Sequence, residues 1–461
     1  MVEHALRTVG MDLEVPLLDG SRRRYVNLDN AASTPPLVEV QEAVERFLPW
    51  YSSVHRGSGF KSQLATEALE EARRLLLRFV GADPQSHAAI FTTNTTEALN
   101  RLAQLYHFQP GDVVLISGME HHANDLPWRA HARVDFAEVT PEGRFDLAAL
   151  ERKLAEHAGR VRLVSVTGAS NVTGFVTPIH QVARLAHAHG AKVVVDAAQL
   201  APHRPISIAH PDQEASIDFL VLSGHKLYAP YGAGALVGPI EFMERVEPDR
   251  WGGGAVRIVS HEEVYLLESP DRLEPGSPNT VGIVALGAAM QALMAHGMDR
   301  VDRHERELTA YALERMRDVP GIRLFGSADP AEVEERVGVI PFMLGDLPHG
   351  LVAAILAQEG GIGVRNGCFC AHPYVLRLLQ VEEERFIQVR DQALRGMKVE
   401  VPGLVRVSFG CYSTAGDVDA LVEMLHRIAR GEYRSGYQLN PATGEYSHPE
   451  YQPDFRACFA L

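Results

Sequence analysis

The most constraining feature of this sequence is a series of short apolar runs that each end in polar residues. Runs of this length are typical of strands buried on both faces of a parallel sheet. Segments with helical spacing separate the runs, which indicates right-handed strand–helix–strand crossovers. The predicted strands occupy residues 89–92, 113–116, 134–138, 163–167, 192–196 and 219–222, and a strand expected to turn back antiparallel follows at 235–237. The sequence therefore predicts an α/β fold around a mainly parallel sheet.

Two of these runs end in residues of opposite charge. Lys226 follows the run at 219–222 within Ser223-Gly224-His225-Lys226, and Asp196 ends the run at 192–196. Ligands of open α/β sheets bind at the carboxyl ends of the strands. A lysine amine there can condense with a carbonyl such as that of pyridoxal phosphate, and a buried carboxylate can pair with a pyridinium N–H. By themselves, the two residues also fit a solvated lysine and an aspartate that caps the next turn.

Two further strand ends carry residues suited to ligand binding. Asn94-Thr95-Thr96-Glu97 opens a helix directly after a strand, and the free N–H groups of such a helix start can hold a phosphate. Glu120-His121-His122 lies just beyond the strand at 113–116. Simple helix capping and histidines without a ligand are the alternatives for these segments.

Composition excludes several classes of protein. A net charge of −15 argues against nonspecific binding to nucleic acid or to an anionic membrane. Four cysteines in 461 residues do not suggest a disulfide framework. Because the N-terminal segment lacks a signal-peptide pattern and no apolar run approaches a membrane span, a cytoplasmic location is the default expectation.

The length of the chain favours two packed domains. The strand–helix repeats place a large cofactor-binding domain at residues 25–290. Strands near 337–343 and 405–409, with helices near 349–358 and 417–430, indicate a smaller α+β domain formed by residues 1–24 and 291–435. The tail at 436–461 has no periodicity and either wraps the surface or is disordered.

Many short motifs occur in one order along residues 25–430. They are Asp29-Asn30-Ala31-Ala32-Ser33, His55-Arg56-Gly57, Thr95 to Asn100, Glu120 to Asn124, Ser170 to Gly174, Asp196-Ala197-Ala198-Gln199, Ser223 to Tyr228, Gly252-Gly253-Gly254 and Pro275 to Thr280. Together this set resembles the class V aminotransferase family, in its cysteine desulfurase and selenocysteine lyase branch. The resemblance implies the pyridoxal phosphate-dependent transferase fold of type I, and it places the loop of His55 and Arg56 near the active site.

The resemblance also implies roles for individual residues. Lys226 is expected to bind pyridoxal 5′-phosphate, and Asp196 and Gln199 to contact its ring nitrogen and its phenolic oxygen. His121 is expected to stack on the ring and to handle protons. The other residues expected at the cofactor are Thr95, Thr96, Asn171, Ser223, His225 and, from the neighbouring subunit of a homodimer, Thr280.

The segment Arg365-Asn366-Gly367-Cys368-Phe369-Cys370-Ala371-His372 raises the question of sulfur chemistry. By resemblance, Arg365 and Arg406, together with Asn171, orient the substrate, and Cys370 is the nucleophile that takes up sulfur as L-cysteine becomes L-alanine. The Gly-Cys-Phe-Cys string looks more like the related loop of molybdenum-cofactor sulfurases, and the stretch at 372–404 is longer than in short-loop desulfurases. A sulfur-acceptor protein is a further expected partner.

Three other interpretations stay open at this point. One is a class V enzyme that acts on another amino acid as a C–S lyase, epimerase or aminotransferase, without persulfide chemistry. Another is a non-catalytic sulfur carrier or binding scaffold that has kept the fold. A zinc site would use Cys368, Cys370, His372 and Cys411, but the spacing lacks the usual two-residue gap, so no metal is expected.

Overall fold

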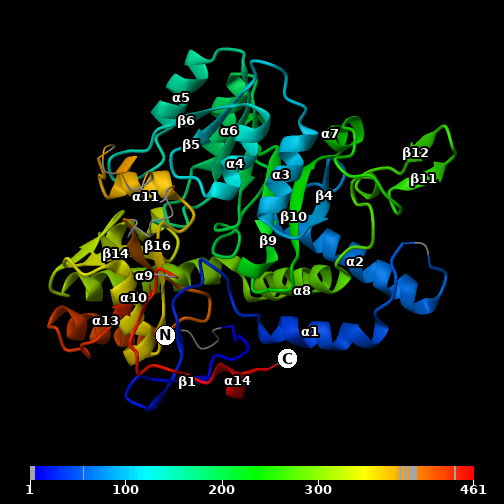
Figure 1. The fold of residues 1–461 in the computed structure, drawn as a ribbon. Coiled ribbons are helices and arrows are strands. Elements are labelled where there is room, and N and C mark those ends of the chain that lie inside the picture. Colours follow the sequence, from blue (N-terminus) through cyan, green and yellow to red (C-terminus); the bar gives the residue numbers. More distant parts are fainter. Residues whose placement is uncertain are drawn as a thin grey trace.

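A seven-stranded sheet organises the larger part of the computed structural model, which describes residues 6–55, 57–382, 384, 387–388, 391, 394, 402–440 and 443–460. Its strands, in spatial order, are β4 (His87–Thr92), β10 (Gly234–Pro239), β9 (Phe219–Ser223), β8 (Lys192–Asp196), β7 (Val161–Thr167), β5 (Val113–Ser117) and β6 (Arg133–Ala137) (Figure 1). Only β10 runs antiparallel to its neighbours. The predicted mainly parallel sheet and its antiparallel strand at 235–237 are confirmed.

Side chains of the central strands alternate between two apolar cores. In β5, Val113 and Leu115 face one core, whereas Val114 and Ile116 face the other. The first core is covered by α1 (Val38–Phe47), α2 (Phe60–Phe79), α5 (Leu147–Glu156), α6 (Ile179–Ala188) and α8 (Thr280–His296). The second is covered by α3 (Thr95–Leu105), α4 (Leu126–His131) and α7 (Ile240–Arg245). Because both faces are buried, the strands appear in the sequence as continuous apolar runs.

A smaller antiparallel sheet lies beside the large one. Its order is β13 (Ile322–Leu324), β14 (Val339–Leu344), β17 (Leu404–Ser408) and β16 (Arg365–Gly367). The helices α9 (Met298–Arg317), α10 (His349–Gly360) and α13 (Ala415–Ala429) contribute to its own apolar core. Between α8 and α9 the chain bends by 77° at Gly297, whose φ of 98° favours glycine.

The N-terminal segment joins this smaller unit. The strand β3 (Val26–Asn27) pairs in parallel with β15 (Ile362–Gly363), and Val26 and Leu28 pack in the smaller core. The strand β3 therefore lies outside the large sheet. The domain limits at 25–290 and 291–435 stay a prediction.

The remaining elements are short. They are β1 (Glu14–Pro16), β2 (Arg22–Arg24), a hairpin of β11 (Val256–Val259) and β12 (Val264–Leu266), α11 (His372–Leu378), β18 (Gln438–Leu439), β19 (Tyr446–Ser447) and α14 (Phe455–Cys458). Figure 1 shows the β11–β12 hairpin projecting from the body of the molecule. Arg56 and much of the stretch after Gln380, which the sequence singled out as a long insertion, lie outside the described residues.

The tail packs against the smaller unit where the structure describes it. The buried His448 donates its backbone N–H to Gln358 Oε1 at 3.0 Å, and the Tyr451 hydroxyl donates to the Pro16 carbonyl at 3.3 Å. Of the two alternatives for residues 436–461, the described part of the tail therefore wraps the surface.

Within the described ranges, no single helix has the length and apolar character needed to cross a membrane. The bent pair of α8 and α9 meets that criterion only when the two helices are taken together, by length and composition alone.

Candidate functional site

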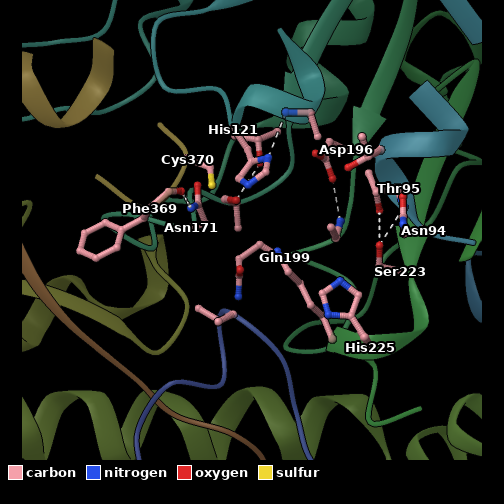
Figure 2. Close-up of a pocket in the computed structure, with 18 of the residues that line it drawn as sticks. Asn94, Thr95, His121, Asn171, Asp196, Gln199, Ser223, His225, Phe369 and Cys370 are labelled. Atoms are coloured by element: carbon pink, nitrogen blue, oxygen red, sulfur yellow. Dashed lines mark hydrogen bonds between the residues drawn. The ribbon is translucent and has the colours of Figure 1, made fainter. Parts of the chain in front are cut away.

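A cavity of about 380 Å³ opens at the carboxyl ends of the parallel strands. This volume is within the range of small-molecule sites. The predicted site residues that line the cavity are Thr95, Thr96, His121, Asn171, Asp196, Gln199, Ser223, His225, Lys226, Arg365, Cys370 and Arg406 (Figure 2). Thr280 is buried at the start of α8 and does not line the cavity of its own chain. Segments far apart in the sequence thus meet at one edge of the sheet, as open α/β sheets require.

Lys226 and Asp196 both line this cavity, and the charge of each affects the other. Lys226 follows β9 in a short helical turn, and burial lowers the pKa of its amine. Asp196 ends β8, and its Oδ1 accepts the Ala198 N–H at 2.9 Å. Burial raises the pKa of the Asp196 carboxyl, while the Ala198 hydrogen bond and Lys226 oppose that rise. The buried Asp196 and the half-buried Lys226 thus favour each other's charged form.

His121 is held as a neutral ring. The Ala123 N–H donates to Nδ1 at 3.0 Å, so Nδ1 carries a lone pair and the proton lies on Nε2. Burial and the nearby charge of Lys226 lower the pKa of His121 to about 3. Burial likewise lowers the pKa of His225 to about 4. Both imidazoles are therefore uncharged near neutrality.

The start of α3 forms a polar cradle at another side of the cavity. The Asn94 side chain caps the helix by accepting the Glu97 N–H at 2.9 Å. Ser223 Oγ accepts the Thr95 N–H at 2.8 Å and lies 2.8 Å from Thr95 Oγ1. The hydroxyls and the positive end of the helix dipole are suited to an anion such as a phosphate.

A carboxylate joins the two predicted substrate arginines. Asp29 Oδ2 lies 2.8 Å from Arg365 Nη2, and Asp29 Oδ1 lies 3.0 Å from Arg406 Nη2. Arg406 also donates from Nη1 to the Asn171 carbonyl at 2.9 Å, while its buried Nε has no hydrogen-bond partner among the described residues. Burial lowers the pKa of Arg406 to about 10, against the effect of Asp29. A buried donor without a partner is unfavourable, so Arg406 Nε is suited to an acceptor brought by a ligand.

Cys370 projects an exposed thiol from a constrained loop between β16 and α11. Phe369 and Cys370 have φ values of 52° and 53°, the left-handed region that residues other than glycine seldom adopt. Asn171 Nδ2 donates to the Phe369 carbonyl at 2.8 Å, and the His122 N–H donates to the Cys370 carbonyl at 2.8 Å. These two hydrogen bonds therefore hold the peptide on each side of Cys370.

The other two cysteines considered for a zinc site have separate surroundings. Cys368 is buried, and its thiol donates to the Pro402 carbonyl at 3.1 Å. The buried Cys411 donates its backbone N–H to the Tyr228 hydroxyl at 2.8 Å. His372 instead stacks on His122, with ring centroids 4.9 Å apart.

Comparison with known proteins agrees with this geometry. Residues 26–421 match the family model described as aminotransferase class-V. The chain belongs to the class-V aminotransferase family. Enzymes of this family use pyridoxal phosphate.

Relatives in the class-V family include proteins named cysteine desulfurase. One from Dickeya dadantii is 38% identical over 413 residues, which cover 87% of this chain and 92% of that protein. An apo structure of a cysteine desulfurase from Thermococcus onnurineus has a TM-score of 0.78 at 30% identity, and the match covers 88% of this chain and 95% of that one. An Escherichia coli cysteine desulfurase in an S-sulfonic acid form has a TM-score of 0.74 at 30% identity, and the match covers 89% of this chain and 96% of that one. The predicted fold of type I is thus confirmed.

Several residues at the class-V site were not singled out from the sequence. Asn94 and Phe369 line the cavity, and Asp29 bridges the two arginines. Each lies inside a quoted motif, so the signal was present without an indication of its role. His203 contacts Gln199, and Glu305 contacts His203. Both residues lie outside every quoted motif.

Proposed function

We propose that this chain is a pyridoxal phosphate-dependent cysteine desulfurase, which converts L-cysteine to L-alanine and retains the sulfur as a persulfide on Cys370. The observation that carries the proposal is the convergence of three groups on one cavity. An exposed thiol, the amine of Lys226 near the buried carboxylate of Asp196, and two arginines all line it. The relatives named cysteine desulfurase support the same reaction.

The residues present fit the cofactor of the family. The start of α3, with Thr95, Thr96 and Ser223, would hold the phosphate, and Asp196 would pair with the ring nitrogen. Gln199, whose carboxamide lines the cavity, would donate an N–H to the phenolic oxygen, and Lys226 would bind the aldehyde carbon. When bound, the cofactor would withdraw electrons from the substrate α-carbon.

The chain's own groups account for substrate binding and proton movement. Arg365 and Arg406 would grip the carboxylate of L-cysteine, because a planar guanidinium matches that group. The Lys226 amine, with its lowered pKa, is suited to take the α-proton. His121 holds a proton on Nε2 inside the cavity and would assist proton transfer to and from the substrate.

The sulfur step uses the thiol of Cys370. Its thiolate attacks the substrate sulfur, a new S–S bond forms, and the substrate Cβ–S bond breaks. The electron pair of that bond remains with the carbon, which takes up a proton and becomes the methyl group of alanine. The substrate thiol and the Cys370 thiol thus become one alanine and one persulfide, with no outside oxidant.

We also propose a homodimer in which Thr280 completes the phosphate site of the partner chain. Thr280 does not line the cavity of its own chain, which supports this arrangement. The projecting β11–β12 hairpin carries the exposed apolar side chains of Ile258, Val259, Val264 and Tyr265. A second copy would cover such a surface. A sulfur-acceptor protein would take the persulfide sulfur from the exposed Cys370.

The test compares Cys370→Ala with Cys458→Ala, which removes the exposed cysteine of α14. Each protein is loaded with pyridoxal phosphate and given L-cysteine, and alanine, sulfide and protein-bound persulfide are measured. We expect Cys370→Ala to lose alanine formation by about a hundredfold or more while its cofactor absorption persists. Cys458→Ala should match the unmodified protein, with persulfide found on Cys370 by mass spectrometry.

Two outcomes would contradict the proposal. If Cys370→Ala processes substrate at the unmodified rate, the protein is a class-V enzyme without persulfide chemistry. If the purified protein stays colourless with added pyridoxal phosphate, it is a non-catalytic scaffold.

A further inference from the structure

A chain of three buried side chains leads from the cavity to helix α9. Gln199 lines the cavity, and its amide nitrogen lies 3.1 Å from Nε2 of His203. His203 Nδ1 lies 2.8 Å from both carboxylate oxygens of Glu305. His203 and Glu305 are only 2% and 3% exposed, so water does not compete for these contacts.

The direction of the hydrogen bonds follows from the donors and acceptors. A carboxylate only accepts, so His203 Nδ1 carries the hydrogen that points to Glu305. The other ring nitrogen then offers a lone pair, and the Gln199 amide donates one N–H to it. Glu305 thus fixes the tautomer of His203, and His203 fixes the orientation of the Gln199 carboxamide. Second-layer residues orient metal-binding histidines in the same way.

In the described part of the chain, no charged side chain donates a hydrogen bond to the Glu305 carboxylate. The charge of Arg204 interacts with that of Glu305, but Arg204 pairs with Asp302 at 3.0 Å and donates to the carbonyls of Val333, Glu334 and Arg336. Tyr228 and Cys411 are the other ionisable groups close to Glu305. A buried carboxylate that accepts side-chain hydrogen bonds from one histidine alone contributes little to stability by itself, which points to a role in orienting that histidine.

We propose that His203 and Glu305 are positioning residues that hold the Gln199 carboxamide toward the ring oxygen of the bound cofactor. The inference rests on the cofactor site of the proposed function. An amide nitrogen is planar and carries two N–H groups, so fixing one toward His203 also fixes the direction of the other. Gln199 therefore presents a preset donor and does not lose rotational freedom when the cofactor binds.

The test uses Glu305→Gln, Glu305→Leu and His203→Phe in the full-length protein. Glu305→Gln keeps an acceptor oxygen for His203 Nδ1, whereas Glu305→Leu removes it and His203→Phe removes the contact with Gln199. Cofactor affinity is measured by titrating the cofactor-free proteins with pyridoxal phosphate, and the visible absorption of each loaded protein is recorded against pH. We expect Glu305→Leu and His203→Phe to bind about three- to tenfold more weakly, with a shifted absorption titration, and Glu305→Gln to resemble the unmodified protein.

A crystal structure of cofactor-free Glu305→Leu gives a readout that does not need the loaded enzyme. We expect the Gln199 carboxamide to turn away from His203 in that variant; if it stays in place, Glu305 does not position it. Unchanged affinity and absorption in His203→Phe would also overturn the proposal, as would equal losses in Glu305→Gln and Glu305→Leu. These readouts are independent of Cys370, so failure of the persulfide step leaves them interpretable.

Discussion

Asp29 shows how one side chain can set the charge of a binding site. Its carboxylate neutralises part of the charge of Arg365 and Arg406 and holds both guanidinium groups in place. Arg365 is half exposed, so this contact restricts a side chain that would otherwise move freely. The cluster keeps one net positive charge, which matches the single carboxylate of cysteine.

Replacing Asp29 with asparagine should weaken substrate binding more than turnover. The amide keeps the size of the side chain but loses the charge that orients Arg365. We expect the KM for L-cysteine to rise about three- to tenfold with kcat nearly unchanged, because the carboxylate is bound equally in the ground and transition states. Steady-state alanine production measures both constants, with Asp19→Asn as an exposed control. A KM that stays the same or falls would show that Asp29 only competes with the substrate.

At the scale of elements, the loop of Cys370 depends on the segments that face it. Asn171 follows β7 and His122 follows β5, and both hold backbone carbonyls of the loop. The left-handed backbone of Phe369 and Cys370 is strained, so it persists only while such contacts maintain it. The large sheet therefore fixes the position of a thiol that belongs to the smaller unit.

Removing the Asn171 side chain should release this loop. In Asn171→Ala, the Phe369 carbonyl loses its hydrogen bond, and we expect faster hydrogen exchange across residues 368–372. Persulfide formation should fall about tenfold or more, because the thiol is no longer held near its target. Hydrogen-exchange mass spectrometry and a persulfide assay measure the two effects, and Asn100→Ala, on the exposed side of α3, is the control. Unchanged exchange in the loop would contradict this role of Asn171.

At the scale of the whole molecule, partly buried histidines make the fold sensitive to acid. The pKa values of His121 and His225 are lowered to about 3 and about 4, and that of His122 is also lowered, in each case mainly by burial. The unfolded chain therefore binds protons that the folded chain does not. The stability that these neutral histidines contribute is fully present above their ordinary pKa of 6.5, and it is lost as the pH falls below that value.

The cofactor-free protein should accordingly lose unfolding free energy between about pH 6.5 and pH 4. Replacing His225 with glutamine removes one of the protons taken up on unfolding. The unfolding free energy should therefore fall less steeply with decreasing pH, by up to the slope that one proton contributes. Urea unfolding at several pH values measures the slope, and His261→Gln, at an exposed loop position, should leave it unchanged. An unaltered slope in His225→Gln would contradict the assignment.

The proposed dimer can be tested by mixing two inactive variants. Lys226→Ala lacks the cofactor lysine, and Thr280→Val lacks the hydroxyl expected in the partner's phosphate site. If Thr280 acts in the partner, a hybrid dimer contains one intact site, and full reassortment should restore about a quarter of the unmodified activity. Mixing after dissociation, followed by an alanine assay and measurement of molar mass, tests this. No recovery from a mixture that forms dimers would contradict shared sites.

The sequence by itself determined the sheet, its antiparallel strand and most of the residues around the cavity. This was possible because strands buried on both faces must be apolar along their whole length, and because ligand-binding residues in such sheets follow the strand ends. Only the tertiary structure decided which groups meet across the chain. The contacts of Asp29 with Arg406, Asn171 with Phe369 and His203 with Glu305 join residues about a hundred or more positions apart. Local sequence patterns do not predict such pairs, because they come together only when distant parts of the chain pack against each other.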